Sequence, residues 1–298
     1  MQKIFLVTGG AGFIGTNLCE ALIAAGHHVR VVDDLTAGNA DRLPAEVVFH
    51  KVDIRHTTAL TDICEGVDVL VHLAALPRVQ FSIDEPVAAH DVNVNGTLSV
   101  LEAARVAGVG RVVFATSAAV YGDQETLPLS LSLPAEPKSP YALHKLMGED
   151  MMKLWSMIYA LPTVSLRFFN VYGPHFDPDG PYALVIGRFL KLRKEGAPLT
   201  VTGDGEQTRD FVHVHDVVSA IIRAATATQV GNGEVLNVGS GVPTSINELV
   251  AIIGGDVEYV PPRLEPRHSL ADISETKRLL SWEPTKKVAD GVAALLAE

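Results

Sequence analysis

Tyr141 and Lys145 lie four residues apart in the segment SPYALHKLMGE (139–149). Ser139 and Pro140 are typical of a helix N-cap and a first helical position, so both side chains would lie on one helix face within reach of each other. A nearby ammonium group favours the phenolate form of tyrosine, whose ordinary pKa is about 10. Such a pair can take a proton from an alcohol near neutral pH, although Tyr-x-x-x-Lys also occurs by chance.

A hydroxyl group elsewhere in the chain strengthens this interpretation. The run VVFATSAAVYG predicts a buried strand that ends at Thr116 and Ser117. The carboxyl ends of parallel strands line the ligand crevice of a doubly wound sheet. Ser117 would therefore reach the same substrate oxygen as Tyr141, and the three groups together could move a proton to and from a ligand hydroxyl group.

A glycine-rich segment predicts the second ligand of this site. IFLVTGGAGFIGTNL places Gly9, Gly12 and Gly15 at a three-residue spacing, after an expected strand and at the start of an expected helix. Gly9 allows a tight turn, Gly12 lets the backbone approach a pyrophosphate, and Gly15 lets the helix pack closely on the strand. The helix N-terminus offers N–H groups and a positive dipole end to the phosphates.

The next strand ends at Asp33, 18 positions after Gly15. A carboxylate there can accept both hydrogen bonds of a ribose diol and would repel a 2′-phosphate, which favours NAD over NADP. Asp34 is an alternative ribose partner. Asp53 and Ile54, after a third strand, could flank an adenine, although a surface carboxylate beside a core residue explains them equally well.

Alternating strands and helices would bring these groups together. Strands that are apolar at nearly every position are buried on both faces, and strict alternation with helices indicates βαβ units. We expect strands at 3–9, 28–33, 47–53, 67–75, 111–117 and 162–169, with helices at 13–26 and 93–108 among them. This pattern predicts an α/β fold with a doubly wound parallel (Rossmann) sheet and a smaller α/β substrate-binding lobe. Residues 1–168 would form the NAD-binding domain, with strands returning from about 205–240, and 169–298 mainly the second lobe.

Composition narrows the possible partners. The net charge is −11 and there is no basic stripe, which argues against a nucleic-acid or anionic-membrane partner, and no apolar run is long enough to span a bilayer. Two cysteines, Cys19 and Cys64, fit a reducing cytosol and a cytoplasmic location. His213 and His215 share a strand face, but no third ligand follows at a convincing spacing, so we expect no metal site.

Seven motifs, in order, connect these features. TGGAGFIG (8–15), Asp33, HLAA (72–75), TSAAVYG (116–122), YALHK (141–145), RFFNVYGP (167–174) and GDGEQTRDFVHVHDVV (203–218) resemble the extended short-chain dehydrogenase/reductase family, and within it most closely the nucleotide-sugar 4-epimerases. The resemblance spans nearly the whole chain. It implies that a hydride passes from sugar C4 to NAD, and that the 4-keto sugar turns over and receives the hydride on its other face.

The resemblance also assigns roles to residues. Tyr141 would be the base, Lys145 would lower its pKa and hold the nicotinamide ribose, and Ser117 would relay the proton. We expect cofactor contacts from Gly9, Gly12, Phe13, Ile14, Gly15, Asp33, Asp53, Ile54, Leu73, Ala74, Ala75, Asn93, Tyr141 and Lys145.

The residues after Ser117 bear on the reaction type. The similar 4,6-dehydratases carry Asp-Glu directly after the catalytic hydroxyl, and the UDP-glucuronate decarboxylases carry a Glu nearby. This chain has Ala118 and Ala119 there, and alanine cannot move a proton. The expected activity is therefore NAD-dependent 4-epimerisation of a UDP-hexose. The alternatives are UDP-glucuronate 4-epimerisation, a dehydratase or reductase of another nucleotide sugar, and a non-catalytic NAD-sensing protein, against which the Tyr/Lys pair counts.

Further residues match substrate contacts of the family. The arginines expected at the UDP diphosphate are Arg209, Arg263 and Arg267, of which the last two fall in a segment one residue shorter than the family's usual form. Asn170 matches a substrate-facing amide, and Ser82 is a weaker candidate. Ser269 occupies a position beside the sugar 2-position where bulky aromatics exclude N-acetyl groups, so UDP-GlcNAc and UDP-GalNAc should fit. The family also suggests a homodimer formed by the helices that begin near Asn93 and Pro140.

Overall fold

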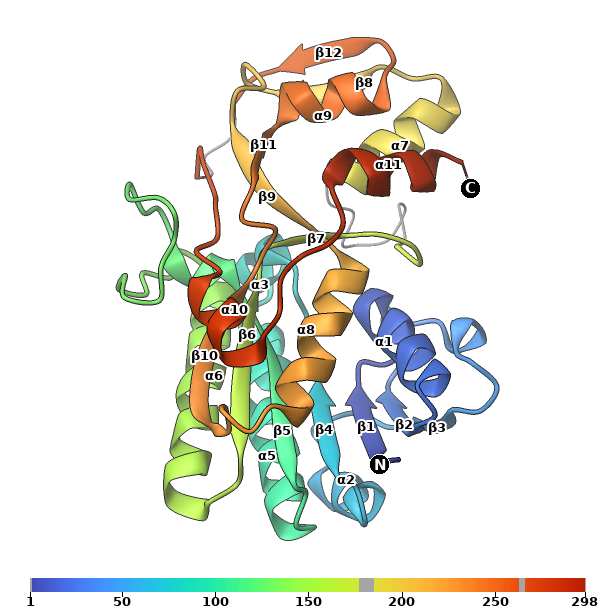
Figure 1. Ribbon diagram of the computed structural model, residues 1–298, viewed down its shortest axis with the longest axis vertical. Coiled ribbons are helices and arrows are strands. Elements are labelled where there is room, and N and C mark those ends of the chain that lie inside the picture. The colour runs from blue at the N-terminus through green and yellow to red at the C-terminus, as the bar shows by residue number, and fades with distance from the viewer. Residues whose placement is uncertain (1, 177–184, 263–265, 298) are drawn as a thin grey trace.

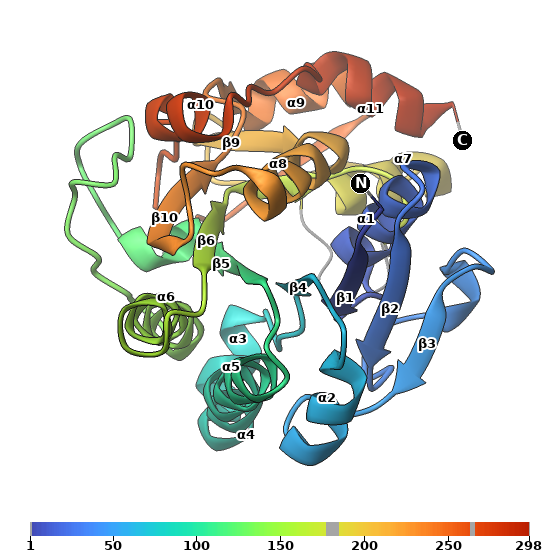
Figure 2. The same ribbon diagram turned by 60° about the horizontal axis from the view of Figure 1, so that its bottom comes forward.

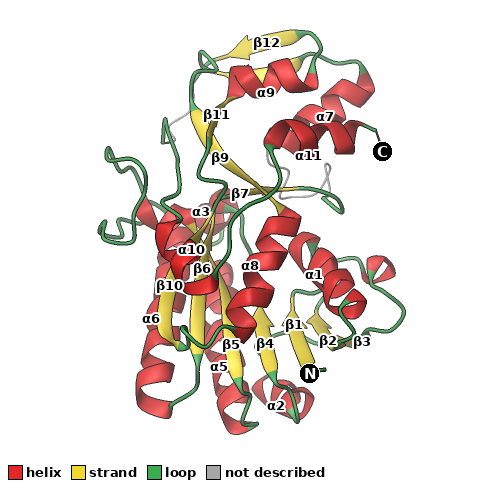
Figure 3. Ribbon diagram, in the orientation of Figure 1, coloured by secondary structure: helices red, strands yellow, loops and turns green. Residues whose placement is uncertain are grey.

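A seven-stranded parallel sheet forms the base of the molecule. The computed structural model describes residues 2–176, 185–262 and 266–297, and the strands run in the order β10-β6-β5-β4-β1-β2-β3 (Figures 1 and 3). Their bounds are β1 Ile4–Thr8, β2 His28–Asp33, β3 Val48–Lys51, β4 Val69–His72, β5 Arg111–Ser117, β6 Thr163–Phe168 and β10 Asn232–Val238. The central strands are almost wholly buried because helices cover both faces of the sheet.

Figure 2 shows the two helical layers of this doubly wound sheet. One face carries α1 (Phe13–Ala24), α8 (Val214–Thr226) and α10 (Ser274–Leu280). The other carries α2 (Thr57–Cys64), α3 (Val79–Asp84), α4 (Pro86–His90), α5 (Gly96–Val106) and α6 (Pro140–Tyr159). Short helical turns lie at Ala40–Arg42 (η1) and Ala118–Tyr121 (η3). Among the described residues, no helix combines the length and the apolarity needed to cross a membrane.

One long helix of the second layer contains a π-helical segment. The stretch from Pro86 to Val106 is continuous, but η2 (Asp91–Asn95) has π geometry. The sequence pattern predicted only the part from residue 93 onward. Insertions of this type shift the side chains that follow around the helix axis and are frequent at functional sites.

A smaller lobe sits above the carboxyl ends of the large sheet (Figure 1). It contains β7 (Asn170–Tyr172), β9 (Thr208–His213) and β11 (Pro243–Ser245) in one sheet, and β8 (Leu199–Thr202) with β12 (Val257–Val260) in another. Helices α7 (Val185–Glu195), α9 (Ile246–Ile253) and α11 (Val288–Leu296) pack around an apolar core that includes Phe189, Phe211 and Leu249. From the segment 205–240, α8 and β10 join the large domain, whereas β9 belongs to the small lobe.

Candidate active site

A single cavity of about 1650 Å³ lies between the carboxyl edge of the large sheet and the small lobe. Its volume exceeds the range of about 300–1,000 Å³ typical for one small ligand, so it has room for a dinucleotide and a second molecule. The predicted site residues that line it are Gly9, Gly12, Phe13, Ile14, Gly15, Asp33, Asp53, Ile54, Leu73, Ala74, Ala75, Ser117, Tyr141, Lys145, Asn170, Arg209, Arg267 and Ser269. Residues far apart in sequence therefore share one site.

The turn between β1 and α1 fits a dinucleotide pyrophosphate. Gly9 has φ +70°, and a Cβ there would lie 2.7 Å from the backbone N of Ala74. A Cβ at Gly15 would lie 2.4 Å from the carbonyl oxygen of Gly9. Gly12 is the N-cap of α1 and offers no side-chain hydrogen bond to the first N–H groups of the helix. These N–H groups are placed where they could bind phosphate oxygens, and their contact with a dinucleotide stays a prediction.

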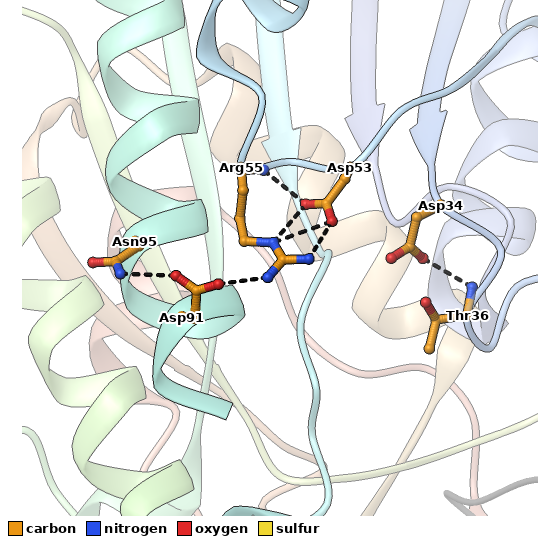
Figure 4. Close-up of polar contacts among 6 residues, drawn as sticks. All are labelled: Asp34, Thr36, Asp53, Arg55, Asp91 and Asn95. Carbon is orange, nitrogen blue, oxygen red and sulfur yellow. Dashed lines mark hydrogen bonds and ion pairs between the residues drawn. The ribbon is translucent and has the colours of Figure 1, made fainter. Parts of the chain in front are cut away.

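Asp33 ends β2 beside this turn. Its carboxylate accepts hydrogen bonds from the backbone N–H of Leu35 (2.8 Å) and of Ala11 (3.1 Å). Burial raises the pKa of Asp33, and these two hydrogen bonds act in the opposite direction. Asp34 also lines the cavity and accepts the backbone N–H of Thr36 at 2.8 Å (Figure 4). Both carboxylates remain candidates for the ribose diol.

An arginine that the sequence did not single out fixes Asp53. Arg55 Nε donates to Asp53 Oδ1 at 3.0 Å, and Arg55 Nη1 donates to Asp91 Oδ2 at 2.5 Å (Figure 4). Asn95 Nδ2 donates to the other oxygen of Asp91 at 3.0 Å. The hydrogen bond from Arg55 lowers the pKa of Asp53. The cluster therefore joins the loop after β3 to η2 and holds an ionised carboxylate at this end of the cavity.

The three predicted catalytic side chains meet at the carboxyl end of β5. Tyr141 lies in the first turn of α6, whose N-cap Ser139 accepts the backbone N–H of Ala142 at 3.2 Å. The Ser117 hydroxyl lies close enough to Tyr141 to lower the pKa of its phenol. Lys145 Nζ donates to the carbonyl oxygen of Ala115 at 2.8 Å and lies 6.0 Å from the centroid of the Tyr141 ring.

Burial determines the proton affinities of this group. It raises the pKa of Tyr141 to about 12, while the Ser117 hydroxyl acts in the opposite direction. It lowers the pKa of Lys145 to about 8. Desolvation of the phenolate is the main cause of this rise, and the lowering of the Tyr141 pKa by the Lys145 ammonium stays a prediction. The neutral phenol is the favoured form.

Two predicted contact residues lie outside the cavity. Ser82 is fully buried; its hydroxyl donates to the carbonyl oxygen of Val79 at 2.6 Å and accepts the backbone N–H of Tyr141 at 3.0 Å. Asn93, in the π-helical segment, exchanges two hydrogen bonds of 2.7 and 3.0 Å with the backbone of Leu76. Both side chains bond to the backbone of cavity-lining residues, so they help to position the site. The sequence predicts a ligand contact for both, and neither faces the cavity interior.

The small lobe contributes the opposite wall. Arg209 Nη1 donates to the carbonyl oxygens of Thr208 (2.9 Å) and Arg267 (3.2 Å), and Arg267 Nη2 pairs with Asp204 at 2.8 Å. Asn170 Nδ2 donates to the carbonyl oxygen of Asp210 at 3.3 Å. The backbone of Ser269 is held by Thr208 at 3.1 Å, which leaves its small side chain at the cavity. Arg263 lies outside the described residues.

The histidines near these motifs pack against other side chains or cap a helix. His144 is buried and packs edge-on against the ring of His90, 5.1 Å away, and it does not line the cavity. His213 is the N-cap of α8 and accepts the backbone N–H of His215. In the described ranges, no group of three histidine, cysteine or acidic side chains is arranged to hold a metal ion.

A Rossmann sheet whose glycine-rich turn, serine and Tyr/Lys pair open into one cavity defines a short-chain dehydrogenase/reductase fold. Residues 5–239 match the sequence profile described as "NAD dependent epimerase/dehydratase family". The chain therefore belongs to this family. The family assignment confirms the predicted fold class and the predicted cofactor, NAD.

Individual relatives agree with this assignment. The chain is 40% identical to a UDP-glucose 4-epimerase of Mycolicibacterium smegmatis, over 97% of this chain and 96% of the relative. A UDP-N-acetylglucosamine 4-epimerase of Methanobrevibacter ruminantium, solved with UDP-N-acetylmuramic acid, superposes with a TM-score of 0.93 at 34% identity, covering 99% of both chains. A Thermus thermophilus UDP-glucose 4-epimerase solved with NAD has a TM-score of 0.90 at 32% identity, covering 99% and 98%. Other matches include a UDP-glucuronate 4-epimerase and a sugar-nucleotide decarboxylase.

Proposed function

We propose that this protein inverts C4 of a UDP-hexose by oxidising it to a 4-keto sugar and reducing it on the opposite face. The observation that carries the proposal is the meeting of Ser117, Tyr141 and Lys145 in the same cavity as the glycine-rich turn. The relatives named above supply the substrate class. Arg209 and Arg267 line the small-lobe wall, where guanidinium groups suit a diphosphate.

The arrangement of side chains suggests how they divide the chemistry. NAD, held by the turn after β1, by Asp33 and by Lys145, supplies a hydride acceptor and donor when bound. As the phenolate, the form that the nearby Lys145 ammonium favours, Tyr141 would take the proton of the C4 hydroxyl group, and Ser117 beside it would align that oxygen. In the second half of the reaction Tyr141 returns the proton to the keto oxygen. Burial favours this step because it stabilises the neutral phenol over the phenolate.

Ala118 and Ala119 favour epimerisation over dehydration. Both line the cavity directly after Ser117, in the short turn η3. A dehydratase needs an acid and a base to remove water across C5 and C6, and methyl groups at these positions cannot transfer a proton. Epimerisation needs no proton transfer at C5 or C6, so the site is sufficient for it.

An NMR assay of C4 inversion distinguishes the remaining candidates. Purified protein would be incubated with UDP-glucose, UDP-N-acetylglucosamine and UDP-glucuronate in separate samples. We expect the galacto epimer to form from UDP-glucose and from its N-acetylated counterpart. Inversion of UDP-glucuronate alone would assign the uronic-acid activity. NAD binding without inversion of any sugar would indicate an NAD-sensing protein.

Ser269 should decide whether an N-acetyl group is accepted. Its side chain lines the cavity, on a segment whose backbone is bonded to Thr208. Ser269→Tyr adds an aromatic ring at this wall, so we expect kcat/KM for UDP-N-acetylglucosamine to fall by about 10- to 100-fold, with kcat/KM for UDP-glucose nearly unchanged. Steady-state assays on both sugars measure this ratio.

Ser269→Ala is the matched control because it removes the hydroxyl group and adds no bulk. It should leave the preference between the two sugars unchanged. The assignment would be wrong if Ser269→Tyr left the ratio unaltered, or if the unmodified protein turned over only the sugar without the acetyl group.

We further propose a homodimer built on the exposed face of the α3–α6 layer. Large apolar side chains gather there, although charged groups usually cover a solvated helix surface. They are Ile83, Val87, Leu98 and Val106 on α3, α4 and α5, and Leu143, Leu154, Met157, Ile158 and Tyr159 on α6. A second copy, related to the first by a two-fold axis, would cover α5 and α6 with its own α5 and α6.

Charge substitution on this face should weaken the dimer. Leu98→Arg combined with Leu154→Arg would place guanidinium groups where apolar surface is expected to be buried, and we expect the dissociation constant to rise on the order of a hundredfold. Analytical ultracentrifugation measures it. Val242→Arg, at an exposed apolar position in the small lobe, is the control and should leave the mass unchanged. A monomeric unmodified protein would exclude the dimer.

A reducing cytoplasmic location remains a proposal. Cys19 and Cys64 are both free and buried, in α1 and α2. Burial raises the pKa of each thiol to about 12, which disfavours the reactive thiolate.

A further inference from the structure

A buried ion pair joins the catalytic helix α6 to strand β6. Glu149, one turn beyond Lys145 on α6, accepts hydrogen bonds from Arg167 Nε (2.9 Å) and Nη2 (2.7 Å). The side chains of Glu149 and Arg167 are only 4% and 8% exposed. Removing two charges from water is costly, so such a pair is weak evidence for a role in stability alone. Neither residue lines the cavity.

The pair connects two strands and one helix that carry the site. Thr116, which precedes Ser117 on β5, donates its hydroxyl proton to Glu149 Oε1 at 2.7 Å. Arg167 immediately precedes the cavity-lining Phe168 on β6. Glu149 itself shares α6 with Tyr141 and Lys145. One carboxylate thus joins β5, β6 and α6 at the level of the catalytic groups.

Arg167 is in turn fixed from its other side. Its guanidinium lies 4.6 Å above the ring of Tyr121, whose hydroxyl donates to Asn237 Oδ1 on β10 at 2.8 Å. The amide of Asn237 donates to the carbonyl oxygen of Leu129 at 2.8 Å. Because Arg167 cannot shift without breaking these contacts, the Glu149 carboxylate has a defined place.

Lys145 faces titratable groups from several elements. From α6 these are Tyr141, His144 and Glu149; from β4 it is His72; Arg167 on β6 lies beyond Glu149. His72 is enclosed between the hydroxyls of Thr8 and Thr97, and burial lowers its pKa to about 3, so it carries no charge at neutral pH. Burial also lowers the pKa of His144. Glu149 is therefore the anionic group in this described set.

The environment of Lys145 makes that anion important. The ammonium is buried, with one hydrogen bond to the carbonyl oxygen of Ala115 and the face of Phe114 4.9 Å away. Burial lowers the pKa of Lys145 to about 8, and the negative charge of Glu149 acts in the opposite direction. Without Glu149, desolvation would deprotonate the lysine close to neutral pH.

We propose that Glu149, fixed by Arg167 one turn beyond Lys145 on α6, is a positioning residue whose negative charge keeps Lys145 in its ammonium form. The inference rests on the proposed function, because the ammonium is the group that would hold the nicotinamide ribose and assist Tyr141. Glu149 does not line the cavity. It would affect the reaction only through the charge state of Lys145.

Glu149→Gln tests this directly. The amide keeps a hydrogen-bonding partner for Thr116 and loses the charge. We expect the alkaline limb of the pH profile of kcat/KM to move to lower pH by about one unit or more, because the Lys145 ammonium then loses its proton more readily. NMR of ¹³Cε,¹⁵Nζ-labelled lysine, with Lys145 assigned by Lys145→Arg, should show the same shift in the absence of substrate.

Two matched variants isolate the charge. Thr116→Val removes one hydrogen bond to Glu149 and no charge, and Asp150→Asn removes an exposed carboxylate from the adjacent position of α6. Neither should move the Lys145 titration or the alkaline limb. A shift in Thr116→Val as large as that in Glu149→Gln would reduce Glu149 to a packing role and overturn the proposal.

Arg167→Met is a second test, in which the pKa of Lys145 should shift in the opposite direction. It can be used even if Glu149→Gln does not fold. It leaves Glu149 facing Lys145 without its other cation, so the Lys145 titration should move to higher pH. An unchanged titration, or one at lower pH, would overturn the proposal. Because lysine NMR needs no turnover, failure of this inference is distinguishable from failure of the proposed function, which would appear as no inversion by the unmodified protein.

Discussion

Tyr141→Phe should reduce kcat for C4 inversion by about 10²- to 10⁴-fold, the usual contribution of a positioned acid or base. The substitution removes one oxygen atom, and the ring keeps its buried position at the start of α6. Ser117 then lacks the phenol oxygen beside it, and no other tyrosine of the described residues lines the cavity. The NMR inversion assay measures the rate, and circular dichroism checks the fold.

Tyr159→Phe is the matched control for this loss. Tyr159 ends the same helix, is 47% exposed and lies outside the cavity. It should retain full activity. A Tyr141→Phe protein whose rate stayed within tenfold of the unmodified protein would remove Tyr141 from the reaction and leave His144 to be tested as the base.

Gly15→Ala should abolish stable NAD binding. Its Cβ would lie 2.4 Å from the carbonyl oxygen of Gly9 and 2.6 Å from the Cα of Gly10, and backbone atoms cannot move aside as a flexible side chain can. The turn must open, which displaces the N–H groups expected to hold the pyrophosphate. We expect overpacking to cost about 1–3 kcal/mol of stability and NAD affinity to fall at least on the order of a hundredfold. Calorimetry with NAD and thermal unfolding measure the two effects.

Gly26→Ala separates loss of stability from loss of binding. Gly26 lies after α1 with φ +80°, and a Cβ there would meet no atom within 4 Å. The left-handed conformation should cost about 1–2 kcal/mol of stability, while NAD binding remains intact. Normal NAD affinity in Gly15→Ala would contradict the assignment of this turn to the dinucleotide.

Much of the fold and the cofactor end of the site could be predicted from local patterns. A strand, three glycines and a helix form one contiguous segment, so spacing alone places Gly9, Gly12 and Gly15 relative to one another. The same holds for Tyr141 and Lys145 on α6 and for Ser117 at the end of β5. The assignment of β9 to the small lobe was not predictable, because the pairing of β9 with β7 and β11 depends on distant segments.

The expected ligand contacts of two side chains differed from the structure because the sequence does not show which way a side chain points. Ser82 and Asn93 lie beside cavity-lining residues in sequence, yet Ser82 turns to the backbone of α6, and the π-helical segment directs Asn93 to the backbone of Leu76. The raised pKa of Tyr141 depends on the burial of its side chain, which a motif does not reveal.

The Glu149–Arg167 pair did leave a signal in the sequence. Arg167 is the one charged residue of the strand segment PTVSLRFF, and a charge in a strand buried on both faces requires a partner. Glu149 is four residues beyond Lys145 and eight beyond Tyr141, so it lies on the same face of the helix. Only the contact between α6 and β6 shows that these two residues are partners.

Incubation of the protein with UDP-[4-²H]glucose in ordinary water tests the central claim most directly. If hydride leaves C4 and returns to it within one site, NMR and mass spectrometry should find UDP-galactose that keeps deuterium at C4, with no net consumption of NAD. Replacement of the label by solvent hydrogen, or retention of the gluco configuration at C4 despite bound NAD, would contradict the account.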